Sequence, residues 1–499
     1  MTWANGGKAD RKNIRTGIST VCLPTRATTF LENSSSVPLA EAIPNKKAVT
    51  THLRPKDGGV GSPRPTVAEV IRGWKSLITR TVGHSIWQTS FYDHIIRSPD
   101  DYNTNLALHR HQPRQWAQDT LYVTDFPDPV RRPGCCTNKE VTQMSRYFTK
   151  TLAALEPYTP GEQLKLPDLV KLNANENPYP PAPDVAAAVA GAVPGLRLYS
   201  DLTEAALCAA IARHCGVQPE NILCGNGSDE NLLLALRAFC DETHPLAFAD
   251  ITYSFYPVLC DLLHIPQHVI LVEEDFSLDL SKYHGLNETI VIANPNAPTT
   301  LLQPVAAIEE VVRTNPDSIV IVDEAYIDFA GPNASCVPLT KKYDNVIVVQ
   351  TFSKSHNLAG ARVGFCVANP ELIADMNRIK FSYSPYNVNS LSQAAAVAAM
   401  EDENYFRDTV GKICATRADT MTKLRERGFT GPDSATNFLF VTTSRMPCKQ
   451  IFERLRQKGV LIRYFSAPRL SDYLRITIGT PEQMQRFFEE LDLILGNTA

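Results

Sequence analysis

Short apolar runs alternate with amphipathic stretches over most of the chain after about residue 220. The amphipathic segments 228–240, 253–264 and 305–315 have the apolar spacing of helices. Runs of strand length, rich in Val and Ile, lie between them at 221–225, 245–249, 268–272, 289–294, 318–326, 345–352 and 361–368. Strands that alternate with helices predict an α/β fold with a largely parallel sheet covered on both faces.

The C-terminal part has a different pattern. The segments 437–444, 460–465 and 474–480 are typical of strands, and a helix is predicted from Cys448 onward. We therefore predict a large sheet domain over 196–385 and a smaller α+β domain over 386–499. Residues 151–195 are assigned to an N-terminal arm of this two-domain part.

The first 150 residues lack this alternation. Residues 1–65 mix Ser, Thr, Pro, Gly and Lys without a sustained apolar period and are predicted to be disordered. Apolar residues recur on one helical face from Thr66, so residues 66–122 are predicted to form a helical fragment. Residues 123–150 are assigned to a linker.

The balance of charged residues also differs between residues 1–150 and the rest of the chain. Residues 1–150 carry 21 Lys and Arg against 12 Asp and Glu, and the remainder carries 28 against 41. Such asymmetry suggests different origins or partners for the two parts. The twelve cysteines show no metal-ligand spacing, so no metal site is predicted, and free thiols in a reducing compartment are expected. With no apolar run of membrane length and no apolar signal region, a cytoplasmic protein is predicted.

Candidate chemistry lies at the ends of the predicted strands. Asn296, Asp323 and Lys354 each follow an apolar run, where open parallel sheets bind ligands. Ser228 and Asp229 open a predicted helix after a Gly-Asn-Gly turn, and a helix N-terminus is a favourable anion site. Each feature also has a plain structural explanation: a capped helix, a satisfied buried acid or a surface lysine.

Taken together, these groups match a pyridine ring that carries an aldehyde and a phosphate. A lysine can form a Schiff base with the aldehyde, and an aspartate can keep the ring nitrogen protonated. An asparagine can bind the ring hydroxyl, and a helix N-terminus with Ser353 and Arg362 can bind the phosphate. The sequence therefore indicates pyridoxal 5'-phosphate as cofactor.

Residues from about 171 to 480 resemble histidinol-phosphate aminotransferase, a family of fold-type I pyridoxal-phosphate enzymes. The resemblance rests on an ordered series of motifs: KLNANENPYPP, LYSD, GNGSDE, TYSFY, NPNAPT, DEAYIDF, TFSKSHNLAGARVGF and LRITIGT. It implies a large, mostly parallel seven-stranded sheet domain and a smaller C-terminal domain. It also implies that Lys354 binds the cofactor covalently and shuttles the proton, while Asp323 pairs with the ring nitrogen.

The resemblance assigns further residues by position. Asn296 and Tyr326 bind the ring hydroxyl, and Tyr253 stacks on the ring. Tyr199 reaches the phosphate of a neighbouring subunit, which implies a homodimer. Four residues are expected to bind the substrate, namely Arg475, Arg463, Asn177 and Tyr179, and the two arginines form a clamp for its anionic group. The implied reaction is transamination between histidinol phosphate and 2-oxoglutarate in histidine biosynthesis, with imidazole acetol phosphate and glutamate on the other side.

Two positions depart from the family pattern. Thr300 stands where the family usually has a glycine, and a threonine is strained there if the position needs a positive φ. Gln350 stands where the family usually has an arginine. Both changes affect the expected loop geometry, and neither removes a catalytic group.

The segment 66–122 resembles the C-terminal part of small tyrosine transposases related to insertion sequences. Tyr92 corresponds to the tyrosine that attacks DNA in that family, but no His-x-His pair precedes it, since His109 and His111 follow it. A vestigial fusion is therefore expected, and nucleic acid is not an expected partner. A transposon insertion or an artefact of gene annotation would give the same sequence.

Two alternatives stay open for the function. One is a related enzyme of the same fold, either a threonine-phosphate decarboxylase or an aromatic amino-acid aminotransferase. The other is an inactive fusion with residual DNA binding, against which the intact Lys354, Asp323 and Arg362 argue.

Overall fold

The structure is a computed structural model that describes residues 145–164 and 168–496 of the 499-residue chain. All described residues belong to one compact unit, Pro129–Ala499. The predictions for 1–65 and 66–122, and most of the proposed linker 123–150, lie outside the described residues. In the part that is described, no helix is both long and apolar enough to cross a membrane.

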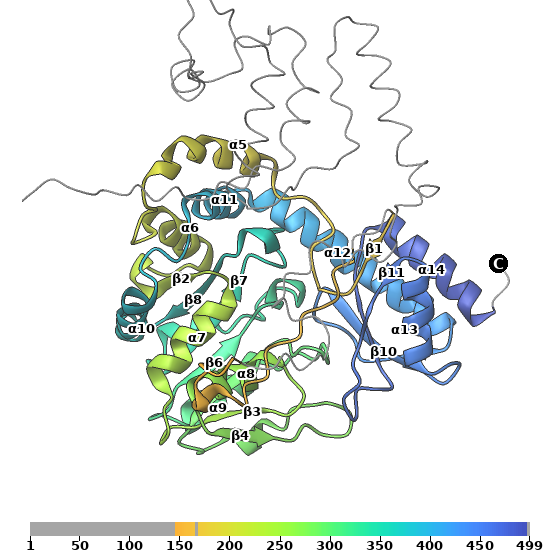
Figure 1. Ribbon diagram of the computed structural model, residues 1–499, viewed down its shortest axis with the longest axis horizontal. Coiled ribbons are helices and arrows are strands. Elements are labelled where there is room, and N and C mark those ends of the chain that lie inside the picture. Colours follow the sequence, from red (N-terminus) through yellow and green to blue (C-terminus); the bar gives the residue numbers. More distant parts are fainter. Residues whose placement is uncertain (1–144, 165–167, 497–499) are drawn as a thin grey trace, which may run out of the picture. The chain divides into compact units, whose positions relative to one another are not determined.

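A seven-stranded sheet forms the centre of the large domain (Figure 1). Its order is β2-β8-β7-β6-β5-β3-β4, and β8 runs antiparallel to the other six strands. The strands are β2 (Ile222–Gly225), β3 (Leu246–Ala249), β4 (Gln267–Ile270), β5 (Thr289–Ala293), β6 (Val320–Asp323), β7 (Val346–Thr351) and β8 (Gly364–Ala368). The predicted largely parallel sheet is confirmed: six of its seven strands lie inside a predicted apolar run, and β4 begins one residue before its run.

Helices cover both faces of this sheet, as the unbroken apolar runs require. One face packs on α5 (Pro183–Ala192), α6 (Ala205–Cys215), α9 (Val305–Thr314) and α11 (Ser390–Glu401). The other packs on α7 (Ser228–Phe239), α8 (Phe255–Leu263) and α10 (Pro370–Tyr383). Alternate residues of one strand serve the two faces, so Val346 and Val348 point to the first and Ile347 and Val349 to the second.

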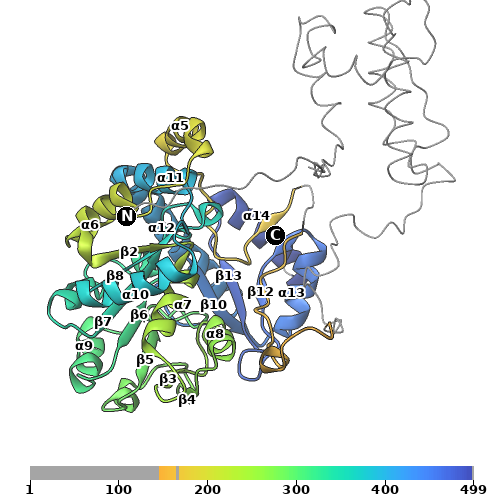
Figure 2. The same cartoon turned by 60° about the vertical axis from the view of Figure 1, so that its left-hand side comes forward.

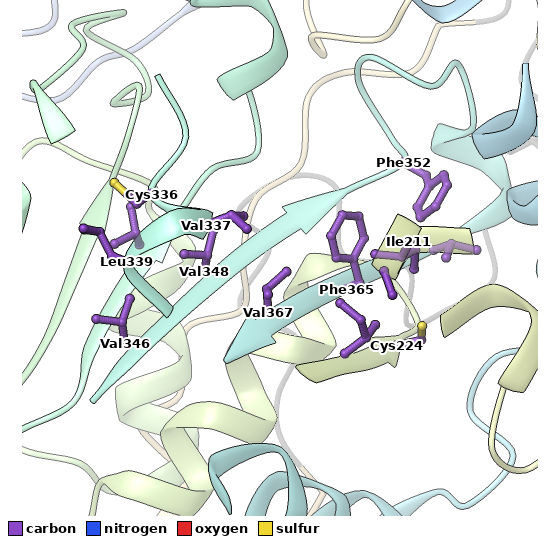
Figure 3. Close-up of a cluster of buried hydrophobic side chains, with 14 of the residues drawn as sticks. Ile211, Cys224, Cys336, Val337, Leu339, Val346, Val348, Phe352, Phe365 and Val367 are labelled. Carbon is purple, nitrogen blue, oxygen red and sulfur yellow. The ribbon is translucent and has the colours of Figure 1, made fainter. Parts of the chain in front are cut away.

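The apolar core on the first face of the sheet is continuous along β7 and β8. Figure 3 shows side chains from both strands gathered with Ile211 of α6 and Cys224 of β2. The strand residues shown there are Val346, Val348, Phe365 and Val367, and all four are fully buried or nearly so. This rigid layer fixes the positions of the strand ends above it.

The small domain packs a four-stranded antiparallel sheet on three helices. Its strands are β9 (Phe429–Thr430), β10 (Phe438–Thr443), β12 (Arg463–Tyr464) and β13 (Leu474–Thr477), and its helices are α12 (Glu403–Glu426), α13 (Cys448–Gln457) and α14 (Pro481–Leu495). The arm joins this domain through β1 (Val170–Lys171), which pairs in parallel with β11 (Val460–Leu461).

Packing divides the two domains later in the chain than the predicted boundary at 386. Buried alanines of α11 belong to the large-domain core, and α11 lies beside α5 and α6 in both Figure 1 and Figure 2. Small-domain packing begins within α12, where Ile413, Met421 and Leu424 are buried. The alanine-rich pattern of α11 suits either core, so only its tertiary contacts assign it.

Candidate active site

Three of the expected site residues lie at one edge of the sheet because their strands are parallel neighbours. Asn296 follows the end of β5 by three residues, Asp323 is the last residue of β6, and Lys354 follows β7 by three residues. β6 pairs with β5 on one side and with β7 on the other. The structure therefore gathers these three residues at the carboxyl edge, as the sequence predicted.

The antiparallel strand β8 brings the fourth group to the same edge. Gly364 at the start of β8 pairs with Gly225 at the end of β2 and with Thr351 at the end of β7. Arg362 thus lies beside the N-terminus of α7, where its Nη2 is 3.0 Å from Asp229 Oδ2. This ion pair joins the segment before β8 to the start of α7, although the two residues lie more than a hundred positions apart in the sequence.

Asp323 is buried with two hydrogen-bond donors and no direct cationic partner among the described residues. The Tyr256 hydroxyl donates to its Oδ2 at 2.8 Å, and the Ala325 N–H donates to its Oδ1 at 3.2 Å. Burial raises the pKa of Asp323 to about 6, and these two donors oppose the rise. A nearby cation would favour the ionised carboxylate, which makes Asp323 a suitable partner for a protonated ring nitrogen.

Lys354 is half-buried and its amine is weakly held. Its Nζ donates to the Ala174 carbonyl at 3.4 Å and lies 5.6 Å from the centre of the Tyr326 ring. Its backbone is held more firmly, since Asn177 Nδ2 donates to the Lys354 carbonyl at 2.9 Å. A fixed backbone with a loosely bound amine suits a lysine that must form and release a covalent bond.

The N-terminus of α7 has donors to spare. No side chain caps this helix, and within the described residues neither the amide nor the hydroxyl of Ser228 has a hydrogen-bond partner. A side chain at Gly227 would displace the Arg362 guanidinium, because a Cβ there would lie 2.5 Å from its Nη2, and the φ of 88° also disfavours one. Ser353 is buried nearby at the end of β7 and accepts a hydrogen bond from the Thr351 hydroxyl. Uncapped amides, hydroxyls and a guanidinium form a donor set that suits a phosphate.

Asn296 is buried with its side-chain amide fully engaged. Its Nδ2 donates to the Ile251 carbonyl and the Thr299 hydroxyl, both at 2.9 Å, and its Oδ1 accepts from Thr252 Oγ1 at 2.7 Å. An amide group has only two hydrogens to donate. Asn296 can therefore donate to a ring hydroxyl only by exchanging one of these bonds.

Three tyrosines, Tyr253, Tyr326 and Tyr158, lie near the groups at the sheet edge and near Arg475 of the small domain. Tyr253 donates its hydroxyl to Asp229 Oδ1 at 3.0 Å, and burial raises its pKa well above the usual range. The Tyr326 hydroxyl accepts a hydrogen bond from Asn175 Nδ2 at 2.9 Å. Tyr158 of the arm lies edge-on to Tyr253, with ring centres 6.1 Å apart.

The two predicted substrate arginines lie side by side in the small domain. Arg463 of β12 pairs directly with Arg475 of β13 in the antiparallel register, and both guanidinium groups lie within 5.5 Å of the centre of the Phe465 ring. Backbone carbonyls are their hydrogen-bond partners, and neither has a carboxylate partner in the described chain. The Nε of Arg475 is buried without a partner, and burial lowers the pKa of this guanidinium.

The other predicted residues are placed less centrally. Asn177 reaches the lysine segment, but the Tyr179 ring lies 5.6 Å from Lys412 Nζ of α12, and its backbone carbonyl accepts from Asn357. Tyr199 is 82% exposed and stacks on Tyr386, with ring centres 4.5 Å apart. Neither tyrosine contacts the groups at the sheet edge within this one chain.

The two departures from the family pattern have visible consequences. Thr300 has φ of 69°, is fully buried, and its hydroxyl has no hydrogen-bond partner. The expected strain at this position is therefore present. Gln350 donates to Glu324 Oε2 at 2.8 Å. Burial raises the pKa of Glu324 to about 7, and its three hydrogen-bond donors, all neutral, only partly oppose the rise.

Sequence reasoning missed three residues of this region. Tyr256 binds Asp323, Tyr158 lies between Tyr253 and the arginines, and Asn175 joins Tyr326 to Thr477 of β13. Tyr256 lies in an apolar helix and so looked like a core residue. Asn175 adopts a positive φ of 55°, and its place in the NANEN motif was the signal available.

An open sheet with a lysine, an aspartate and an anion-binding helix at its carboxyl edge, faced by a smaller domain, defines a class of pyridoxal-phosphate enzymes. The sequence profile of the family described as Aminotransferase class I and II matches residues 167–491.

Curated relatives identify the family within this class of enzymes. The chain is 43% identical to the histidinol-phosphate aminotransferase of Brachyspira hyodysenteriae over 355 residues, which are 71% of this chain and 100% of the relative. It is 44% identical to histidinol-phosphate aminotransferase 1 of Hydrogenovibrio crunogenus over 354 residues, 70% of this chain and 99% of the relative. This chain belongs to the class I and II aminotransferases, and within them to the histidinol-phosphate aminotransferase family.

A solved structure agrees on the fold. Histidinol-phosphate aminotransferase from Sinorhizobium meliloti, in complex with pyridoxal-5'-phosphate, aligns with a TM-score of 0.64. The alignment covers 72% of this chain and 100% of that one at 24% identity.

Proposed function

We propose that this protein transfers the amino group between histidinol phosphate and 2-oxoglutarate, with pyridoxal 5'-phosphate as cofactor. The observation that carries the proposal is the meeting of Lys354, Asp323 and the uncapped α7 N-terminus opposite two arginines without acidic partners. The 43–44% identity to histidinol-phosphate aminotransferases supports the choice of substrate. The reaction belongs to histidine biosynthesis, and the free thiols of the nine described cysteines suit a cytoplasmic enzyme.

The donor set of the sheet edge fits the cofactor. When bound, pyridoxal phosphate supplies an aldehyde for the amino group and a ring that draws electrons from the substrate's α-carbon. Lys354 would hold the aldehyde, and its freed Nζ would accept the α-proton and return it to the former aldehyde carbon of the cofactor. Asp323 keeps the ring nitrogen protonated. Ser228, Ser353 and Arg362 bind the phosphate, and Tyr253 and Tyr326 border the ring.

The arginine pair is assigned to the substrate's anionic group. Histidinol phosphate carries a phosphate, and glutamate carries carboxylates, so one pair of guanidinium groups can serve both half-reactions. Arg463 and Arg475 lack a carboxylate partner within the described chain, so their charge is available to a ligand. Tyr158 is close enough to interact electrostatically with both arginines, and it can therefore border the same anion.

A homodimer is the proposed assembly. Apolar side chains are exposed around Tyr199 and its stacking partner Tyr386: Val193, Leu196, Leu198, Leu202, Phe381 and Tyr383. Exposed apolar side chains in two segments that the ring stack joins favour an interaction site. Tyr199 lies within it and would face the site of a second copy. Light scattering of the purified protein tests the assembly, and a monomer at micromolar concentration would contradict it.

A comparison of separate substrates tests the proposed reaction. The purified full-length protein with pyridoxal phosphate is given histidinol phosphate, phosphothreonine or phenylalanine in turn, with 2-oxoglutarate as acceptor. We expect glutamate to form with the highest kcat/KM from histidinol phosphate and no release of CO₂ from phosphothreonine. A higher kcat/KM for phenylalanine, or CO₂ release without glutamate, would replace the proposed function with one of the related activities.

A further inference from the structure

Two thiols touch one another beneath the candidate phosphate site. The Sγ atoms of Cys208 on α6 and Cys224 on β2 are 3.8 Å apart. Both residues are buried, with 8% and 0% of their surface exposed. Figure 3 shows Cys224 directed into the buried cluster beside Ile211 of α6. Among the described cysteines, no other pair is joined by a sulfur–sulfur hydrogen bond.

We propose that Cys208 and Cys224 are a modification site that forms a reversible disulfide when the protein meets a peroxide. Nothing in the aminotransferase reaction uses either thiol, so this site goes beyond the proposed function. The disulfide would join α6 to the last strand residues before the Gly-Asn-Gly turn.

The geometry requires a short movement. A disulfide has an S–S distance of about 2.05 Å, so the sulfurs must approach by roughly 1.8 Å. Rotation of the Cys208 side chain on α6 supplies part of that approach. The start of α6 cannot move freely, because Lys380 binds both carboxylate oxygens of the buried Glu204 at 2.6 and 2.8 Å. The rest of the approach of the two sulfur atoms must therefore come from a shift of Cys224 on β2.

The chemistry balances with one peroxide. The Cys208 thiolate attacks a peroxide oxygen, which gives a sulfenic acid and releases hydroxide that becomes water. The Cys224 sulfur then displaces the sulfenic hydroxyl as a second water, and the two thiols together lose two electrons. Cys208 is the first to react because it is the more exposed thiol and the hydrogen bond from Cys224 lowers its pKa.

Movement of Cys224 would reach the anion site because the intervening turn is tightly packed. A Cβ on Gly225 would lie 2.6 Å from Asn231 Oδ1, and one on Gly364 would lie 2.3 Å from the Ser228 amide nitrogen. The Asn387 side chain also binds the Cys224 carbonyl at 3.3 Å. Because the backbone of this turn is packed so closely, a shift of Cys224 would also shift Ser228 at the start of α7.

Peptide mapping tests the disulfide directly. Purified protein is treated with hydrogen peroxide, alkylated and digested with trypsin and a glutamate-specific protease. Cleavage after Arg213 separates Cys208 from Cys224, and cleavage after Glu220 separates Cys215 from Cys224. We expect a cross-linked pair of peptides that contain Cys208 and Cys224 and that dithiothreitol separates. Free or singly oxidised thiols at both positions, or a link to Cys215, would overturn the proposal.

Variants confirm the partners. Cys215→Ser is the matched control and should leave the cross-link unchanged, while Cys208→Ser should abolish it. Because Cys224 is wholly buried, Cys224→Ser is used only if its circular dichroism matches the wild type. A peroxide cross-link that persists in Cys208→Ser would count against the pair.

The functional effect is measured by binding. Apo-protein, reduced or oxidised, is titrated with pyridoxal 5'-phosphate, and we expect oxidation to weaken binding by about tenfold and dithiothreitol to restore it. Equal affinity of the two forms would overturn the link between the disulfide and the anion site. Failure of the reduced protein to bind would contradict the proposed cofactor instead, and peptide mapping would still decide on the disulfide.

Discussion

The large-domain sheet edge and the small-domain arginine pair satisfy their polar groups in opposite ways. At the sheet edge, the Asp323 side chain has two hydrogen-bond partners within the protein and the Asn296 side chain has three. In the small domain, Arg463 and Arg475 bind only backbone carbonyls, and their charges have no acidic partner among the described residues. The first arrangement suits a group that stays bound, and the second suits an anion that comes and goes.

Under the proposed function, this difference assigns cofactor binding to the large domain and substrate binding to the small domain. A pre-organised site needs side chains locked by their own neighbours, as Asp323 and Asn296 are at the sheet edge. A transient anion binds best to a charge that is not already neutralised, which the arginines provide. Changes at the sheet edge should therefore act on kcat, and changes at the arginines on KM.

The largest effect is expected from Lys354→Ala. Loss of the amine removes both the covalent link and the proton shuttle, so kcat should fall by about 10⁴ or more. Rates of glutamate formation measure this, and Lys449→Ala on the exposed face of α13 is the control. A loss of less than about tenfold would assign the proton transfer to another residue.

Arg475→Met should come second, and should act on substrate binding. Without its guanidinium, kcat/KM for histidinol phosphate and for glutamate should each fall by about 10²–10³, mainly through KM. Arg463→Met should cost less, because that side chain is more exposed. Steady-state kinetics measure both, with the exposed Arg486→Met as control. A fall in kcat at unchanged KM would contradict the division between the domains.

Gln350→Arg tests the electrostatics behind the sheet edge. The folded pKa of Glu324 is about 7 against an ordinary 4.5, so its contribution to stability is full below about 4.5 and is lost as pH rises through 7. An arginine would favour the ionised carboxylate and should stabilise the protein at pH 8 by roughly 1–3 kcal/mol, with little gain at pH 4.5.

Urea unfolding at both pH values measures this difference. In a Glu324→Gln background the gain at pH 8 should disappear, because no carboxylate remains to pair with the arginine. A gain that is the same at both pH values would show that packing, and not charge, is responsible.

The smallest effect is expected at Thr300. Replacement by glycine removes the left-handed strain and the unpartnered hydroxyl, and should raise the free energy of unfolding by about 1 kcal/mol. Thr300→Ala removes the hydroxyl but keeps the strain, so it is the matched control. If thermal or urea unfolding shows alanine to be as stabilising as glycine, the backbone strain is not significant.

Much of the fold and part of the site could be predicted from the sequence. The seven strands of the large sheet and the helices between them follow from apolar periodicity, and Asp323 and Lys354 stood out because each follows an apolar run. Tyr158 and Tyr256 could not be predicted in the same way. Their roles depend on contacts with residues about 95 and 67 positions away, which no local pattern encodes.

The chemistry of the individual residues was determined by the sequence: an amine, an acid and an anion-binding helix start, each at a strand end. Their meeting was decided by the tertiary structure, because strand order and the reversed direction of β8 place Arg362 beside Asp229. The same holds for the Cys208 and Cys224 thiols, which looked like ordinary core cysteines until α6 packed on β2. Local patterns record which groups a chain carries, but only the packing of distant segments brings those groups within bonding distance.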